Sequence, residues 1–557
     1  MILKQLVKLI DRHEWIFVGL MSLLLVIITA VPYIYGYLAA APGYVYNGLH
    51  ALSPGDVPVY YSYIQQVKTG NFLLNDLFTS EPQNLGIFNI WWFLVGLLTK
   101  FFPLSIPLIF QLSRLLTIPF FIVTAYLFLA YFFKAVVLRK LSLLILVFSS
   151  GLGFYFAAPL EAIGYQGLGG HYWWPIDLWL TEANVFNILY QTSHFIISLA
   201  LTLIIFLLML LDFSKPNIRY GLASGIIALV YFNFHPYYFP VIFGALGLYL
   251  FCLMLRQQKF LWHQSSHLIL VLGLSLPSVL YHAWLIGINP VIAQRALQNI
   301  TEISPWPFVL LGFGWLLPGF LLGLWFFVKD KMTDNRLIFL LCWLVVNVVL
   351  IYLPFPFHSR YTQGIQVGLV IFMVLGLSRF YQILCFKLPA RIFNFWINNP
   401  ALWLIIGLVF LMPSTIYSVA RDFYYFHHQG PLAKAYLYLP SDLHQIYDYL
   451  ASQRSGQVVL ASEISSRFVP GFSGQTVYFS HPHETLFYEA KLPLVINFFS
   501  TNNQDDYKQS FLYDAGIDFV IYSEYEKQLG EFQPSTKNYL DLIVDLPKAQ
   551  LYRVIIN

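Results

Sequence analysis

A carboxylate near the start of the chain stands where it could do chemistry. Asp56 follows Pro54 and Gly55. Apolar residues then recur at helical spacing, at Val57, Tyr60, Tyr61, Ile64 and Val67. This spacing predicts an amphipathic helix that lies along a membrane surface. Asp56 therefore has two interpretations: it caps free N–H groups of that helix, or it takes a proton from a substrate hydroxyl.

Further polar candidates lie in segments that interrupt apolar runs. His171, Asp177 and Glu182 fall close together and could supply a second carboxylate or metal ligands. Their spacing matches no fixed metal-site pattern, so hydrogen-bonded loop residues are the alternative. The guanidinium of Arg360 can bind a phosphate through two parallel hydrogen bonds. Alternatively, it extends toward lipid headgroups or pairs with a nearby acid.

Two histidines stand at the ends of apolar runs. His194 and His235 could contact a substrate. Alternatively, His194 bonds a backbone carbonyl and His235 belongs to the turn before Pro236. The aromatic runs 172–174 and 424–426 could stack on a sugar ring, although such runs also mark membrane interfaces.

The composition places these residues in a membrane protein. Of 557 residues, 58% are hydrophobic and only 10% are charged, against roughly 25% charged in soluble proteins. Such a chain lacks the polar residues to cover a globular surface. Its three cysteines lie in or beside apolar runs, so a disulfide framework or CxxC metal site is excluded.

Apolar runs long enough to cross a bilayer predict about eleven transmembrane helices. They lie near 14–38, 105–133, 141–158, 191–211, 219–234, 237–255, 265–286, 306–328, 336–353, 364–384 and 400–419. With the N-terminus inside, 16 of the 21 Lys and Arg residues before residue 420 fall in cytoplasmic segments. We interpret the ambiguous run 86–102 as lying at the outer interface, because a span there would invert every later loop.

The charge balance divides the chain. Residues 1–420 carry +9, and residues 421–557 carry −5. We expect a transmembrane domain over 1–420 with outer loops 39–103 and 158–190, a connector over 421–439, and a soluble extracytoplasmic α/β domain over 440–557. Helices are predicted at 441–452 and 484–499, and strands at 458–461, 476–479, 519–522 and 551–556. No nucleotide-binding or nucleophile-elbow motif occurs there.

Several short motifs together resemble the GT-C superfamily of integral-membrane glycosyltransferases, in particular its bacterial mannosyl- and arabinosyltransferases. They are GDVPVY at 55–60, GNF at 70–72, LTEANVF at 180–186, SHF at 193–195, HPY at 235–237, SRYTQGIQ at 359–366 and AGIDFVIY at 515–522. The resemblance covers the whole chain. It implies a catalytic carboxylate at Asp56 and substrate-binding roles for Arg360, Glu182, His171, His194 and His235. It leaves open a divalent cation.

The expected function is transfer of a sugar, with inversion, from a polyprenyl-phosphate-linked donor to a glycan, lipid or protein acceptor on the extracytoplasmic face. The expected location is the plasma (inner) membrane, with many spans, a cytoplasmic N-terminus and membrane lipids around it. Nucleic acid is not an expected partner. The alternative is a transporter or a flippase or polymerase for lipid-linked glycans. Few paired charges and no repeated pair of broken helices are visible, which weakens the transporter interpretation.

Overall fold

The computed structural model describes residues 3–51, 55–162, 174–354, 356–387 and 400–555. Contacts within the chain group it into two compact units. The first comprises Met1–Ala30, Arg114–Leu280 and Thr301–Arg421. The second comprises Val31–Ser113, Tyr281–Ile300 and Asp422–Asn557. The long loop after the first helix thus belongs to the same unit as the C-terminal region.

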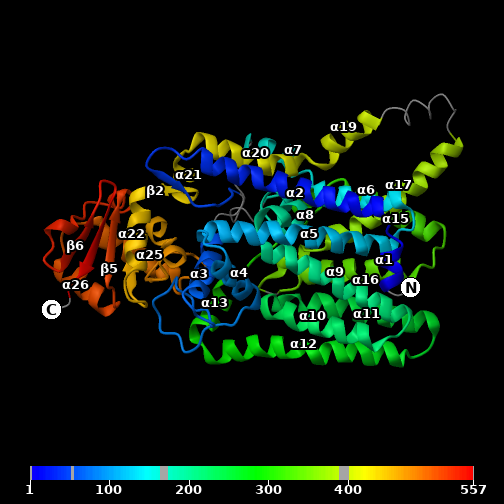
Figure 1. Cartoon of the computed structure of the whole chain (residues 1–557), viewed down its shortest axis with the longest axis horizontal. Coiled ribbons are helices and arrows are strands. Elements are labelled where there is room, and N and C mark those ends of the chain that lie inside the picture. The colour runs from blue at the N-terminus through cyan, green and yellow to red at the C-terminus, as the bar shows by residue number, and fades with distance from the viewer. Residues whose placement is uncertain (1–2, 52–54, 163–173, 355, 388–399, 556–557) are drawn as a thin grey trace. The chain divides into compact units, whose positions relative to one another are not determined.

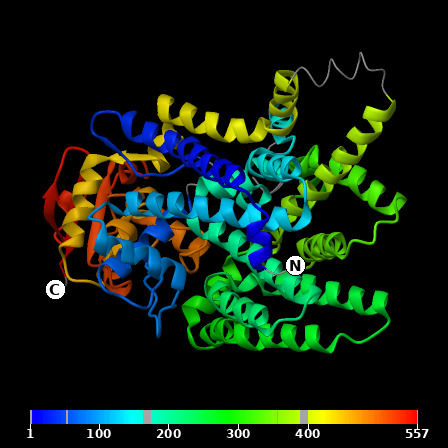
Figure 2. The same ribbon diagram turned by 45° about the vertical axis from the view of Figure 1, so that its right-hand side comes forward.

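The first unit consists of packed helices (Figure 1). Those that lie in it, wholly or in part, are α1 (Leu3–Lys8), α2 (Arg12–Leu38), α5 (Ile106–Phe132), α6 (Val136–Phe148), α7 (Gly153–Ala162), α8 (Val185–Gln191), α9 (Ser193–Ser214), α10 (Ile218–Phe234), α11 (Phe239–Gln257), α12 (Trp262–Ile288), α14 (Trp306–Phe313), α15 (Leu316–Lys329), α16 (Asn335–Tyr352), α17 (Ile365–Lys387), α19 (Pro400–Leu411) and α20 (Pro413–His428). Helix α9 packs against α10 and α11, and α11 packs against α16. Figure 2 shows these helices as neighbouring green and teal ribbons in the rotated view.

The eleven predicted segments are mainly helical where the structure describes them, but 141–158 is broken at 149–152, between α6 and α7. Eight helices in that part are long and apolar enough to cross a membrane, or nine if one bent pair counts as a single span. The bent pair is α14 and α15, which meet at 81°, because Gly314 between them has a positive φ of 49°. The run 219–234 forms only the 17-residue helix α10. The run 400–419 divides before Pro413, which begins a new helix.

The segment 86–102 forms a short helix, which agrees with the expectation that it does not span the membrane. Helix α4 (Ile90–Phe101) has 12 residues, or roughly 18 Å of helix, less than the ~30 Å bilayer core. Asn89 caps it by accepting from the Trp92 N–H. Trp92 is buried in this unit: it is 3% exposed and stacks on Tyr60 at a centroid distance of 4.6 Å.

The second unit contains an α/β region built mainly from the C-terminal residues. Its elements include β1 (Tyr44–Tyr46), α3 (Val57–Lys68), α4, α13 (Pro290–Gln298), α21 (Pro431–Tyr436), β2 (Tyr438–Pro440), α22 (Ser441–Ala451), β3 (Val458–Leu460), α23 (Glu463–Ser466), α24 (Val469–Ser473), β4 (Thr476–Val477), α25 (Tyr488–Ser500), α26 (Asp505–Asp514), β5 (Phe519–Ser523), α27 (Glu524–Lys527), β6 (Leu540–Asp545) and β7 (Ala549–Val554). The strand order of its mixed sheet is β4-β3-β5-β7-β6. The pairs β3–β4 and β3–β5 are parallel, and the two pairs made by β7 are antiparallel.

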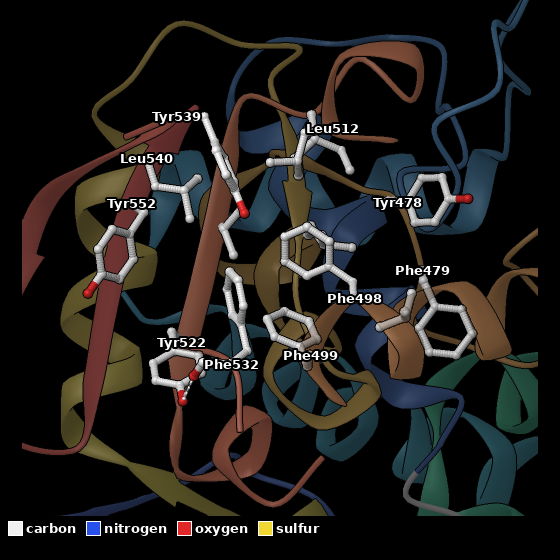
Figure 3. Packing of buried hydrophobic residues seen from close by; sticks show 14 residues of the cluster. Tyr478, Phe479, Phe498, Phe499, Leu512, Tyr522, Phe532, Tyr539, Leu540 and Tyr552 are labelled. Atoms are coloured by element: carbon white, nitrogen blue, oxygen red, sulfur yellow. Dashed lines mark hydrogen bonds between the residues drawn. The ribbon is translucent and has the colours of Figure 1, made fainter. Parts of the chain in front are cut away.

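Aromatic side chains fill the core behind this sheet (Figure 3). Phe498 and Phe499 from α25 meet Phe532, with ring centroids 5.0 and 5.9 Å away. The Tyr522 hydroxyl donates to the backbone carbonyl of Phe532, so the one polar atom it brings into the core is paired. The six secondary-structure segments expected after residue 440 are present, with shifted ends. Strand β6 and helix α26 were not predicted.

Helix α3 is held in the second unit by close contacts. It packs on both α4 and α24. A Cβ on Gly96 would lie 2.4 Å from the Val67 Cβ, so only glycine allows α4 to approach this closely. A Cβ on Gly471 would lie 2.8 Å from the Tyr61 Cβ, so α24 approaches α3 in the same way. These contacts fix the position of the residue that precedes α3, Asp56.

The general fold class is therefore as predicted: a polytopic helical protein with a C-terminal α/β region. The predicted domain boundaries at residues 420 and 440 remain predictions.

Candidate functional site

Asp56 occupies the N-cap position of α3, but its side chain makes no cap hydrogen bond. The reason lies in the first turn of the helix. Pro58 has no N–H to offer, and the N–H of Val59 donates to the backbone carbonyl of Asp56 instead. The capping alternative for this side chain is therefore wrong. The side chain is 45% exposed.

A histidine from the C-terminal region lies against this carboxylate. The Nε2 atom of His481 is 3.6 Å from Oδ1 of Asp56, and the His481 side chain is only 5% exposed. The N–H of His483 donates to Nδ1 of His481 at 3.1 Å. The neutral ring then carries its proton on Nε2, the nitrogen that faces Asp56.

A buried group of charges surrounds the same loop in the second unit. Glu484 pairs with Arg295 of α13, with Oε2 2.7 Å from Nε. Asp76 is 6% exposed and accepts from the Phe78 N–H at 2.9 Å. Burial, reinforced by the negative charge of Glu484, raises the pKa of Asp76 to about 7, although Arg295 and a backbone hydrogen bond act in the opposite direction. Asp76 is therefore half-protonated near neutral pH.

Sequence reasoning identified only Asp56 in this group. Polar density offered one signal, because the segment 480–485 reads SHPHET. Arg295 offered another, since it is one of the five basic residues outside the expected cytoplasmic segments. Neither signal indicates that these residues lie beside the first loop.

In the first unit, Arg360 and Glu182 form an ion pair. Nη1 of Arg360 donates to Oε1 of Glu182 at 2.6 Å, and the Glu182 side chain is 1% exposed. The other oxygen of Glu182 is buried, and no described residue donates to it. The guanidinium also lies 5.4 Å above the ring of Phe195. Pairing with a nearby acid was one of the two alternatives to phosphate binding considered for Arg360, and this contact is present.

The two predicted histidines lie in the same place. The rings of His194 and His235 are 5.2 Å apart, at an interplanar angle of 83°. His194 exchanges a hydrogen bond with the Thr192 hydroxyl at 2.8 Å through Nδ1. Within the described part of the chain, the buried Nδ1 of His235 has no hydrogen-bond partner. We refer to Glu182, His194, His235 and Arg360 as the arginine cluster.

The backbone that carries Arg360 is held firmly. Arg360 belongs to η5 (His358–Thr362), between α16 and α17. The Tyr238 hydroxyl donates to the carbonyls of Arg360 and Gln363. The side-chain amide of Asn347 also donates to the Gln363 carbonyl, at 3.1 Å. Gly364 has a φ of 89°, and a Cβ there would lie 2.4 Å from Trp343. Glycine is therefore required where the chain turns into α17.

The other predicted residues have different outcomes. His171 lies outside the described residues. Asp177 is fully buried in η2 (Ile176–Leu178), where one oxygen accepts from the Gly153 N–H at 3.1 Å. Burial raises the pKa of Asp177 to about 7. In the described part of the chain, no group of three or more His, Cys, Asp or Glu residues could hold a metal ion. The predicted roles of Asp56 and the arginine cluster remain predictions.

No family model matches the sequence, and no curated protein is significantly similar to it. Solved structures share its fold. A crystal structure of the oligosaccharyltransferase from Archaeoglobus fulgidus, tethered with an acceptor peptide containing the NVT sequon, aligns with a TM-score of 0.51 at 12% identity over 90% of this chain and 69% of that chain. An arabinofuranosyltransferase from Mycobacteria gives a TM-score of 0.47 at 12% identity over 96% of this chain and 41% of that one.

At this identity the alignment to the oligosaccharyltransferase shows a common fold. The expected architecture of the chain is thus matched by the fold of a solved structure.

Proposed function

We propose that this chain is a membrane glycosyltransferase that moves a sugar from a polyprenyl-phosphate donor to an acceptor on the extracytoplasmic face. The observation that carries the proposal is the fold shared with the oligosaccharyltransferase over 90% of the chain. A fold alone does not fix an activity, so the assignment also rests on the acidic, basic and histidine side chains described above. The acceptor is a glycan, a lipid or a protein.

Asp56 is the proposed general base. In the reaction, the acceptor oxygen attacks the anomeric carbon while its proton passes to the carboxylate. The bond from the anomeric carbon to the phosphate oxygen breaks, and the polyprenyl phosphate leaves with the bonding electrons. One displacement of this kind inverts the configuration at the anomeric carbon. The side chain suits the role because it is 45% exposed and makes no helix-cap bond.

Arg360 is the proposed binder of the donor phosphate. Its planar guanidinium matches the geometry of phosphate oxygens. Glu182 fixes the orientation of the guanidinium through the 2.6 Å hydrogen bond. His194 and His235, and His171 from the second loop, are the proposed further contacts to substrate.

A transfer assay tests the proposal. The purified protein in lipid nanodiscs is incubated with a panel of polyprenyl-phosphate sugars and short glycan, lipid and peptide acceptors. We expect release of polyprenyl phosphate together with a glycosylated acceptor, and release at least a hundredfold slower by Asp56→Asn. Movement of the lipid-linked sugar across proteoliposomes without release would instead support the flippase alternative and contradict the enzyme proposal.

We further propose a plasma-membrane location with the N-terminus inside and residues 440–557 outside. The support is the distribution of 16 of 21 basic residues over the expected cytoplasmic segments. A reporter fused after Asn557 should be active only in the extracytoplasmic compartment. Activity confined to the cytoplasm would contradict this orientation.

A further inference from the structure

We infer that His481 is the positioning residue of Asp56, so that the C-terminal region acts on the reaction through the carboxylate of the first loop. This inference rests on the proposed function. The contact that carries it is that of Nε2 of His481, 3.6 Å from Oδ1 of Asp56. Gly55 lies close to the same nitrogen, since a Cβ added there would be 3.9 Å from it. The imidazole therefore faces both the carboxylate and the backbone before it.

The loop that carries His481 is anchored. The N–H of Thr485 donates to the His481 carbonyl at 2.8 Å. The Thr485 hydroxyl donates to the carbonyl of Phe78 at 2.8 Å and accepts from the Ser480 N–H at 3.0 Å. The His481 ring also packs edge-on against Phe78, with centroids 6.0 Å apart. The imidazole is thus fixed relative to the loop that follows α3.

The orientation of the ring is fixed as well. Because the His483 N–H donates to Nδ1, the Nε2–H bond faces Asp56 in the neutral ring. At 3.6 Å the contact is electrostatic and longer than a hydrogen bond. Catalytic hydrogen bonds are often long in substrate-free structures and tighten in the reacting complex.

A donor on one carboxylate oxygen has two consequences for a general base. It holds the group in one rotamer, so that the other oxygen is presented to the acceptor hydroxyl, in the manner of the third member of a catalytic triad. It also favours the ionised form, the one able to take a proton. The titratable and charged groups near this loop include His483, Asp76, Glu484, Arg295, Glu81 and Lys491.

Two substitutions distinguish the effect of the Nε2–H donor of His481 from the effects of the other ring contacts. In His481→Gln, the side-chain amide N–H takes the place of Nε2–H and keeps a donor toward Asp56. In His481→Asn, the amide oxygen takes the place of Nδ1 and still accepts from the His483 N–H, but the donor toward Asp56 is lost. A matched control is His444→Asn. His444 also comes from the C-terminal region and contacts the first loop, through Nε2 to Oδ1 of Asn47 at 3.0 Å.

We expect His481→Asn to lower kcat about 10- to 100-fold, as loss of an orienting partner commonly does, with KM for the donor unchanged. His481→Gln should recover most of the loss, and His444→Asn should leave kcat within about twofold of the unmodified protein. In an Asp56→Asn background, His481→Asn should cost nothing further. An equal loss in both backgrounds would show a merely structural role and overturn the inference.

A second readout needs no turnover. An infrared titration identifies the Asp56 carboxyl band as the band that Asp56→Asn removes. We expect its pKa to rise in His481→Asn and to stay near the unmodified value in His481→Gln. An unchanged pKa in His481→Asn would contradict the inference even if transfer is observed. A raised pKa in a protein that transfers no sugar would support the contact while contradicting the proposed function.

Discussion

The structure contains two clusters of polar residues, and the sequence predicts the members of one far better than those of the other. The arginine cluster belongs to the first unit, and each of its four members was predicted. The second group, which we term the loop–domain cluster, consists of Asp56, Asp76, Arg295, His481 and Glu484, and only Asp56 was predicted. The difference follows from how each cluster is assembled. Three members of the arginine cluster, His194, His235 and Arg360, stand at or next to the ends of apolar helices, where a polar side chain is costly and therefore conspicuous. The fourth, Glu182, lies in the loop before α8. Most members of the loop–domain cluster come from polar segments, where one more charge does not indicate which distant segment it contacts.

Each cluster contains an arginine–glutamate pair of similar length. Arg360 and Glu182 approach to 2.6 Å, and Arg295 and Glu484 approach to 2.7 Å. The surroundings differ. Each glutamate has one buried oxygen, Oε2, that accepts no hydrogen bond from a described residue. Glu484 in addition lies close to a second acid, Asp76, and its negative charge raises the pKa of Asp76. The comparison predicts that Arg360 acts on a ligand and that Arg295 balances buried charge.

The largest expected effect is that of Asp56→Asn on catalysis. Asparagine has the same shape but cannot take a proton, and general-base catalysis typically contributes ~10²–10⁴ in rate. We therefore expect at least a hundredfold loss of kcat. Because the Asp56 side chain makes no cap bond, the melting temperature should be unchanged, which calorimetry of the solubilised protein would measure. Near-normal turnover would leave the loop–domain cluster without a catalytic member.

The second largest effect is expected at Arg360. Hydrogen bonds to charged groups are worth about 1.5–3 kcal/mol, so Arg360→Ala should weaken donor binding about 10- to 100-fold. Arg360→Lys keeps the charge but loses the fork geometry. Its donor affinity should therefore lie between that of Arg360→Ala and that of the unmodified protein. Binding is measured with a fluorescent polyprenyl-phosphate sugar.

Two controls sharpen this comparison of the clusters. Arg360→Ala combined with Glu182→Gln avoids leaving a buried carboxylate unpaired, which would otherwise destabilise the protein. Arg295→Ala removes the matching arginine of the loop–domain cluster and should leave donor affinity unchanged. Equal donor affinity in Arg360→Ala, Arg360→Lys and the unmodified protein would end the assignment of a phosphate to the arginine cluster.

The same contrast explains how much of the fold was predictable. Runs of apolar residues located all eleven helical segments, since bilayer thickness sets their length. They did not reveal the break at Gly314, whose positive φ bends α14 against α15 by 81°. Nor did they reveal why Trp92 is buried. Its amphipathic ring suits a membrane interface, but stacking on Tyr60 is a tertiary contact that local pattern cannot show.

The pairing of His481 with Asp56 was beyond sequence reasoning for a related physical reason. The two residues are separated by more than 400 positions, and the histidine lies in a loop whose shape depends on side-chain bonds such as that of Thr485 to Phe78. A motif marks residue types, whereas such a contact depends on how distant segments fold onto one another. Asp56 itself was predicted by its place before an amphipathic helix, and its failure to cap that helix follows from Pro58.

The smallest effect is expected at Asp76, and it concerns stability. Its pKa is raised from 3.8 to about 7 in the folded chain, so the folded state binds more protons than the unfolded state between these values. Stability due to this group is therefore present at low pH and lost as the pH rises from about 4 to about 7. Asp76→Asn removes the ionisable group while keeping an oxygen that accepts from the Phe78 N–H. At pH 8 the variant should be more stable than the unmodified protein, and at pH 4 the two should be equal. Melting temperatures across this range, measured in detergent, provide the test.

Asp505 is the matched control. A hydrogen bond from Lys537 lowers its pKa, so Asp505→Asn should produce a small stability difference of the opposite sign. A stability difference for Asp76→Asn that does not vary with pH would show that Asp76 is ionised throughout, and that the acids of the loop–domain cluster are balanced by Arg295 as completely as Glu182 is by Arg360.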